Sequence, residues 1–110
     1  MFEIQQRKRF TKLLTANSAD SSVIAAVAGK RIIVLSLIAS CGATATTLQF
    51  QSKLGSAAGV DIGPLFSMGI NGIAPLQLED GIFETAVGAA LVADTSNHAA
   101  ISILGTYIEG

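Results

Sequence analysis

The sequence predicts an all-β protein, an antiparallel β-sandwich or jelly roll of about eight short strands. Three observations indicate this fold. Short apolar or alternating runs recur about every 8–12 residues. Glycine, proline and polar turn residues stand between these runs. Two runs, residues 23–39 and 99–109, are apolar on both faces of an extended strand, which is typical of strands covered on both sides.

The length and composition predict one domain that hides apolar surface against another body. A chain of 110 residues fits a single domain, which we divide into a basic arm or first strand (1–20) and a β-sandwich (21–110). Half of the residues are hydrophobic and only 14% are charged, compared with about 25% in ordinary soluble domains. So short a chain covers this much apolar surface poorly by itself. We therefore expect self-association or docking on a larger assembly.

The first half of the chain predicts four strands. Residues 9–14 form one candidate, and residues 22–27 form a second, although the alanines leave a helix open there. After a turn at Gly29-Lys30, residues 31–40 form the clearest strand because they are rich in β-branched side chains. Simple alternation gives this strand two apolar faces, which are listed here: Ile32, Val34, Ser36 and Ile38 on one, and Ile33, Leu35, Leu37 and Ala39 on the other.

Residues 43–52 alternate between apolar and polar side chains. Thr44, Thr46, Leu48 and Phe50 share one face and are expected in the core, while the other row faces solvent or a neighbour. Gly42 permits a sharp reversal, so residues 33–39 and 43–51 form a candidate hairpin. The glycine-rich residues 53–64 then predict a long loop.

The second half predicts shorter elements. Residues 65–68 form a short strand at most, and Asn71-Gly72 is the strongest hairpin signal in the chain. Pro75 places the segment after it at a sheet edge or outside a sheet. Beyond a turn at 79–81, strands are expected over 82–85, 89–93 and 99–109, with a polar turn at 94–98 between the last two.

The sequence contains no set of residues that predicts catalysis, cofactor binding or a metal site. His98 lies in a predicted surface turn, and with Cys41 it provides too few ligands for zinc. Cys41 is expected to be a small buried hydrophobe, and a single cysteine forms no disulfide within the chain. Glu79-Asp80 suits a solvated turn better than a calcium loop. Neither a phosphate-binding loop nor a GxSxG motif is present, so we expect a protein that is not an enzyme and has no cofactor.

The one charge cluster is basic and lies near the N-terminus. Its members are Arg7, Lys8, Arg9 and Lys12, our candidate assembly contacts with an acidic protein surface; the alternative is a charged strand edge that discourages edge-to-edge pairing. A pI of about 5.6 and few aromatic residues argue against nucleic acid as a partner. Lys30 and Arg31 interrupt residues 23–39, so no membrane segment is expected.

The charges are also unevenly distributed along the chain. All seven basic residues lie at or before Lys53, and six of the eight acidic residues follow it. Either the fold has a positive and a negative side, or an antiparallel fold interleaves the two halves and cancels the difference.

Several blocks of the sequence resemble a group of small virion proteins of tailed bacteriophages. The blocks are VIAAVAGKRIIVL at 23–35, TLQFQS at 47–52, GIFETAVGAAL at 81–91, Ser96, and GTYIE at 105–109. The resemblance covers about residues 21–109 and consists mainly of apolar and glycine positions. Lys53 stands where a glycine commonly follows the second block, so the adjacent loop is expected to differ.

The resemblance implies a structural protein of jelly-roll type located in the virion. It implies capsid decoration, as a cement protein that stabilises the shell through contacts without catalysis. The expected partners are the chain itself, as a homotrimer, and the major capsid protein or other virion proteins, with no nucleic acid and no membrane. The alternative is a host-recognition or fibre module that binds a glycan or receptor through residues 55–72, although Tyr107 is the only tyrosine and there is no tryptophan to stack on a sugar.

Overall fold

A computed structural model of the chain describes residues 6–14, 21–77, 81–96 and 100–110. Within these ranges the protein is all-β, and the predicted fold class is confirmed. The strands are β1 (Lys8–Leu14), β2 (Ser21–Ile24), β3 (Ile32–Cys41), β4 (Thr46–Lys53), β5 (Val60–Met68), β6 (Ile73–Gln77), β7 (Phe83–Glu84), β8 (Ala90–Thr95) and β9 (Ile101–Glu109).

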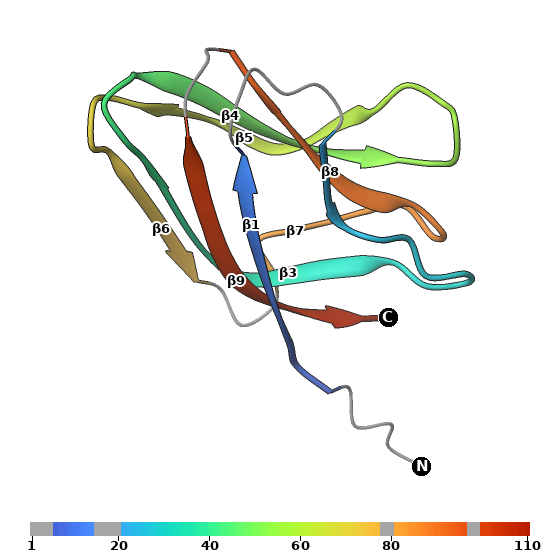
Figure 1. Cartoon of the computed structure of the whole chain (residues 1–110). Helices are drawn as coiled ribbons and strands as arrows, with labels where there is room; N and C mark the ends of the chain where they lie inside the picture. The colour runs from blue at the N-terminus through green and yellow to red at the C-terminus, as the bar shows by residue number, and fades with distance from the viewer. Residues whose placement is uncertain (1–5, 15–20, 78–80, 97–99) are drawn as a thin grey trace.

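The strands form two antiparallel sheets that pack face to face (Figure 1). The first sheet has the order β1-β9-β3-β6, with the short β7 also paired to β3, and the second has the order β2-β8-β4-β5. The pairing is nested, because β1 pairs with β9, β2 with β8, β3 with β6, and β4 with β5. The chain is thus folded into nested antiparallel pairs that form a β-sandwich of one five-stranded and one four-stranded sheet.

The two strands predicted to be central, β3 and β9, lie side by side in the middle of the first sheet. Their register runs from Ile32 opposite Glu109 to Cys41 opposite Ile101, and it shifts between Val34 and Ser36 because of a β-bulge. The bulge reverses the alternation of side chains after Val34. The buried face therefore continues through Leu37 and Ala39, instead of Ser36 and Ile38 as simple alternation predicts.

Within the described ranges of the subunit, β3 is covered on only one face beyond the bulge. Leu37 is fully buried between the sheets, whereas Ile38, on the outer face, is 50% exposed. In the described part of the chain, nothing covers the outer side of Ile38. The second apolar face of β3 is therefore surface of the subunit.

The core lies between the sheets, around Phe50 of β4. Its ring lies 5.1 Å from that of Phe83 and 6.2 Å from that of Phe66, measured between ring centroids. Thr46 and Leu48, predicted to share the inward row with Phe50, are also buried, while Thr44 lies before the strand and is exposed. The alternation over 43–52 thus predicted the inward face of β4 correctly from residue 46 onward.

Two predictions about connections are wrong. Residues 33–39 and 43–51 do not form a hairpin, because β3 and β4 belong to different sheets and the chain crosses between them at residues 42–45. Residues 53–64 are not a long loop, because β5 begins at Val60 and pairs with β4 on both sides of an irregularity at residues 62–64. The side-chain amide of Gln49 donates to the carbonyls of Ile62 and Gly63, which supports this irregular part of β5.

A turn forms where Asn71-Gly72 predicts one, but it does not connect the strands that the sequence predicts. Asn71 has a positive φ of 58°, and the Gly72 amide donates to the Gly69 carbonyl. This turn joins β5 of the second sheet to β6 of the first, so it does not close a hairpin. Pro75 lies in the edge strand β6, as predicted. Residues 25–27 contain no helix, and the expected turns at Glu79-Asp80 and His98 fall outside the described residues.

Thr85 stabilises the end of β3, and we expect Thr85→Val to lower the free energy of unfolding by about 2 kcal/mol. The buried Thr85 hydroxyl accepts the Ile32 amide at 2.9 Å, and the Thr85 amide donates to the Ile32 carbonyl at 2.9 Å. Valine has nearly the same shape but leaves the Ile32 amide buried without this acceptor. Urea denaturation checks the value, and Thr44→Val, at an exposed position, should change it little. Equal effects of the two variants would contradict the prediction.

Candidate assembly surface

The outer surface of the first sheet exposes apolar side chains in a continuous area. We call this area the apolar face and define it by these residues: Arg9, Thr11 and Leu13 of β1; Ser102, Leu104 and Thr106 of β9; Ser36, Ile38 and Ser40 of β3; and Ile73 and Pro75 of β6. They share a face because neighbouring strands place directly opposed residues on the same side of a sheet. Exposed apolar patches of this kind mark contact surfaces in soluble proteins.

The strand register gathers these residues from distant parts of the sequence. Thr11 lies opposite Leu104, Leu104 opposite Ile38, and Ile38 opposite Pro75. The row therefore crosses β1, β9, β3 and β6. Leu104 and Ile38 are about half exposed, and Ile73, in the next row, is two-thirds exposed. A large fraction of their apolar surface is thus available to a partner.

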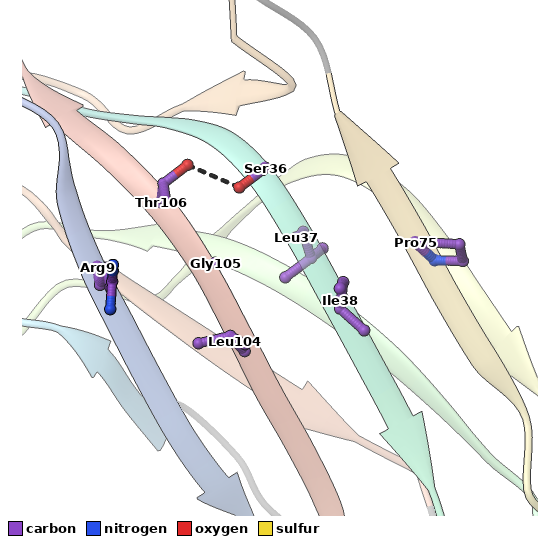
Figure 2. A pocket seen from close by; sticks show the side chains of 8 residues that line it. All are labelled: Arg9, Ser36, Leu37, Ile38, Pro75, Leu104, Gly105 and Thr106. Carbon is purple, nitrogen blue, oxygen red and sulfur yellow. Dashed lines mark hydrogen bonds between the residues drawn. The ribbon is translucent and has the colours of Figure 1, made fainter.

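A groove of about 570 Å³ lies on this face (Figure 2). Leu104, Ile38 and Pro75 form its apolar side, and Arg9 stands at its margin on β1. Ser36 and Thr106, also at the margin, share a hydrogen bond of 2.6 Å between their hydroxyls. A second hollow of about 540 Å³ adjoins it, since Ile38 and Leu104 line both. The face combines an apolar centre with a polar rim, as protein interfaces commonly do.

The four predicted assembly contacts lie on or beside β1, but they do not act as one cluster. Arg9 points to the groove, and Lys12 is half-buried beside the second hollow. Lys8 forms an ion pair with Glu109 of β9 at 2.6 Å, and Arg7 is exposed just before the strand. Of the four, only Arg9 lines the groove, and the role of all four as assembly contacts stays a prediction.

The apolar members of this surface were not among the predicted site residues. Leu104 and Ile38 lie in the two apolar runs, which did indicate excess hydrophobic surface. Which residues of those runs face outward depends on the bulge in β3 and on the pairing of β1 with β9. The sequence indicates that apolar surface is exposed, but it does not identify the residues that form this surface.

The ion pairs show that the fold interleaves the charges of the two halves. Lys8 pairs with Glu109, and Arg31 pairs with Glu84 at 3.2 Å. Each pair joins a base from the first half to an acid from the second. The antiparallel pairing of distant strands thus offsets part of the asymmetry along the sequence.

The Lys8–Glu109 pair predicts a pH effect at high pH. The hydrogen bond to Glu109 and its negative charge raise the pKa of Lys8 above the ordinary value of 10.5. Because the folded-state pKa is the higher one, the stabilisation is fully present below pH 10.5 and is lost as the pH rises through the raised pKa. Urea midpoints at about pH 8 and about pH 12 should therefore differ more for the unmodified protein than for Glu109→Gln. The effect should be small, because Lys8 is solvent-exposed. Identical shifts would contradict the prediction.

The described residues offer little chemistry beyond this surface. No group of three or more histidine, cysteine, aspartate or glutamate side chains among them could hold a metal ion. Cys41 is buried, as predicted, and its thiol donates to the Gly69 carbonyl at 2.8 Å. Among the same residues no helix has the length and apolar character needed to cross a membrane.

Comparisons with known proteins show similarity at the level of the fold. No family model matches the chain, and no curated protein matches it. The solved structure of the SPBc2 prophage-derived protein YomS is similar over 100% of this chain and 98% of that one, with 10% identity and a TM-score of 0.51. A chain from Bacillus endospore appendages, which are disulfide-linked pili, has 10% identity and a TM-score of 0.41, over 93% of this chain and 88% of that one. The likeness to YomS extends over the whole chain and shows a shared β-sandwich fold.

Proposed function

We propose that this protein is a structural component of a bacteriophage virion that decorates and stabilises the capsid as a cement protein. It acts through contacts between subunits and with the shell, and not through catalysis. The observation that carries the proposal is the apolar face of the first sheet, where half-exposed Leu104 and Ile38 adjoin across the central strands. A subunit with such a face is stabilised when a partner covers it.

Two further observations support this function. The sequence blocks at 23–35, 47–52 and 81–91 resemble small virion proteins of tailed phages, and they include parts of the inner strands β3, β4 and β8 as well as the edge strand β2 and the short β7. The fold is also found in a prophage-derived protein. Both observations agree with a structural role in which the protein acts through contacts and not through catalysis.

The recognition alternative has less support than the cement role. It requires a long loop within residues 55–72, but most of that stretch is β5 and the turn at Asn71. What remains between β4 and β5 is a short turn at residues 54–59. A glycan array with strong hits would revive this alternative.

The proposed function is tested on the particle. Capsids lacking this protein are mixed with the purified chain and imaged, and their loss of integrity on heating is recorded. We expect bound copies in defined positions and an increase in the temperature at which the shell opens. Leu104→Asp, which places a charge on the apolar face, should reduce both effects strongly.

The matched control is Leu54→Asp, which adds the same charge at another exposed leucine away from the apolar face. It should bind as the unmodified chain does. Capsids that carry no bound copies, or that bind Leu104→Asp as well as the unmodified chain, would overturn the proposal.

A further inference from the structure

We infer that the apolar face receives the outer surface of β5 from a second copy of the chain, in a head-to-tail contact that places Asp61 of that copy beside Arg9. This inference rests on the proposed function, because it names the two surfaces through which the subunits would assemble. It commits to a second copy as the occupant of the groove because the chain itself carries a surface that matches the groove in charge and spacing.

The matching surface lies on the outer side of the second sheet. We call it the β5 surface and define it by Asp61, Leu65 and Ser67 of β5 with Gln49 and Gln51 of β4. Leu65 is 57% exposed and lies opposite Gln49, while Asp61 lies opposite Gln51. The β5 surface therefore presents one exposed leucine and one carboxylate at an edge of the sandwich.

The two surfaces carry opposite charges. Asp61 is exposed, and one of its oxygens accepts a hydrogen bond of 2.7 Å from Gln51, which leaves the carboxylate with further capacity as an acceptor. Arg9 is exposed and has no ion pair within the described ranges. Glu84, an acid further along the first sheet, is already paired with Arg31. Among the described residues Arg9 thus has no anionic partner, and Asp61 of a second copy can supply one.

The spacing of charge and leucine also agrees between the surfaces. Asp61 and Leu65 lie opposite Gln51 and Gln49, two positions apart on β4, or about 7 Å along the strand. Arg9 lies two positions from Thr11, the residue opposite Leu104, which is again about 7 Å along the strand. When Asp61 meets Arg9, Leu65 can therefore reach the apolar centre of the groove beside Leu104.

The contact joins two different surfaces, so it is heterologous. A heterologous contact closes into a ring when its rotation allows and leaves no apolar face uncovered in that ring. A face-to-face dimer through two apolar faces would exclude Asp61, which lies on the other sheet. The role of Asp61 therefore distinguishes the two arrangements.

A charge exchange tests the inference on the full-length protein. Sedimentation equilibrium measures association of the unmodified chain, Arg9→Glu, Asp61→Arg and the double variant. Each single variant should weaken association by about tenfold or more, because it opposes like charges at the contact. The double variant restores an ion pair of reversed sense and should associate within about threefold of the unmodified chain. Lys30→Glu, a charge reversal at an exposed turn away from both surfaces, should have little effect.

The other outcomes overturn the inference and separate it from the proposed function. If Leu104→Asp blocks association but Asp61→Arg does not, the contact is face to face. If the double variant stays as weak as the single variants, Arg9 and Asp61 do not meet. If the unmodified chain is monomeric yet decorates capsids, the head-to-tail contact is wrong while the proposed function stands. Unfolding midpoints of all variants confirm that each one is folded.

Discussion

Ile103→Asp is expected to unfold the subunit. The Ile103 side chain is 2% exposed and lies between the sheets on β9, a strand with neighbours on both sides. Aspartate removes the apolar contacts and places a carboxyl group among core side chains, where no water can solvate it. The expected loss is about 4 kcal/mol or more in the free energy of unfolding, which is a large share of the stability of a small domain.

The control for this prediction is the next residue along the same strand. Leu104 points to the opposite side and is 48% exposed, so Leu104→Asp should change the free energy of unfolding by only about 0.5 kcal/mol. Circular dichroism during urea denaturation measures both variants. Two variants of equal stability would show that the side chains of β9 do not alternate as described.

Gly105→Ala should lower the free energy of unfolding by about 3 kcal/mol. Gly105 lies in β9 next to the bulge of β3. A Cβ atom there would come within 2.7 Å of two ring atoms of Phe10 and would overlap the carbonyl oxygen of Ser36. The carbonyl belongs to the backbone and the Phe10 ring packs against Tyr107, so the added methyl group is accommodated only with strain.

Gly42→Ala provides the matched control for Gly105→Ala. A Cβ at Gly42 meets nothing within 4 Å, and Gly42 does not have a positive φ. Thermal unfolding of the two variants should therefore separate them by more than 10 °C, given about 4–8 °C per kcal/mol in a domain of this size. A Gly105→Ala protein as stable as Gly42→Ala would contradict the packing described around Phe10.

The elements of the fold could be predicted from the sequence more fully than their connections. Alternation placed Leu48 and Phe50 in the core, and the apolar runs marked β3 and β9 as central strands. These features depend on local patterns of period two. The choice between a hairpin and a crossing to the other sheet does not depend on such local patterns. The reversal at Gly42 therefore predicts a hairpin, whereas the chain crosses there from one sheet to the other.

Two further errors have specific physical causes. Gly63 and Pro64 resemble loop residues, yet β5 accommodates them because it is an edge strand with an irregular register. The bulge after Val34 inserts one residue and reverses the faces of β3 beyond it. Nothing in the run of β-branched residues marks that position.

The candidate assembly surface was the least predictable feature. Its central row joins residues 11, 38, 75 and 104, each from a different strand. Their proximity depends on three separate pairings of distant segments. The sequence indicated that apolar surface would be exposed, and it identified Arg9 as a candidate contact, but the groove beside Arg9 required the register of the whole sheet.

The nested pairing of strands has a consequence for how the chain folds. The outermost pair joins Lys8 of β1 to Tyr107 of β9. Because β9 is the last strand to be synthesised, β1 can pair only after nearly the whole chain has left the ribosome. Contacts between such distant residues carry a large loop-closure cost, and folding is expected to take milliseconds to seconds. During that time the strands that will form the core are exposed. Synthesis at high concentration would therefore favour sequences whose partly folded chains resist aggregation, and the cationic residues along β1 would serve that need.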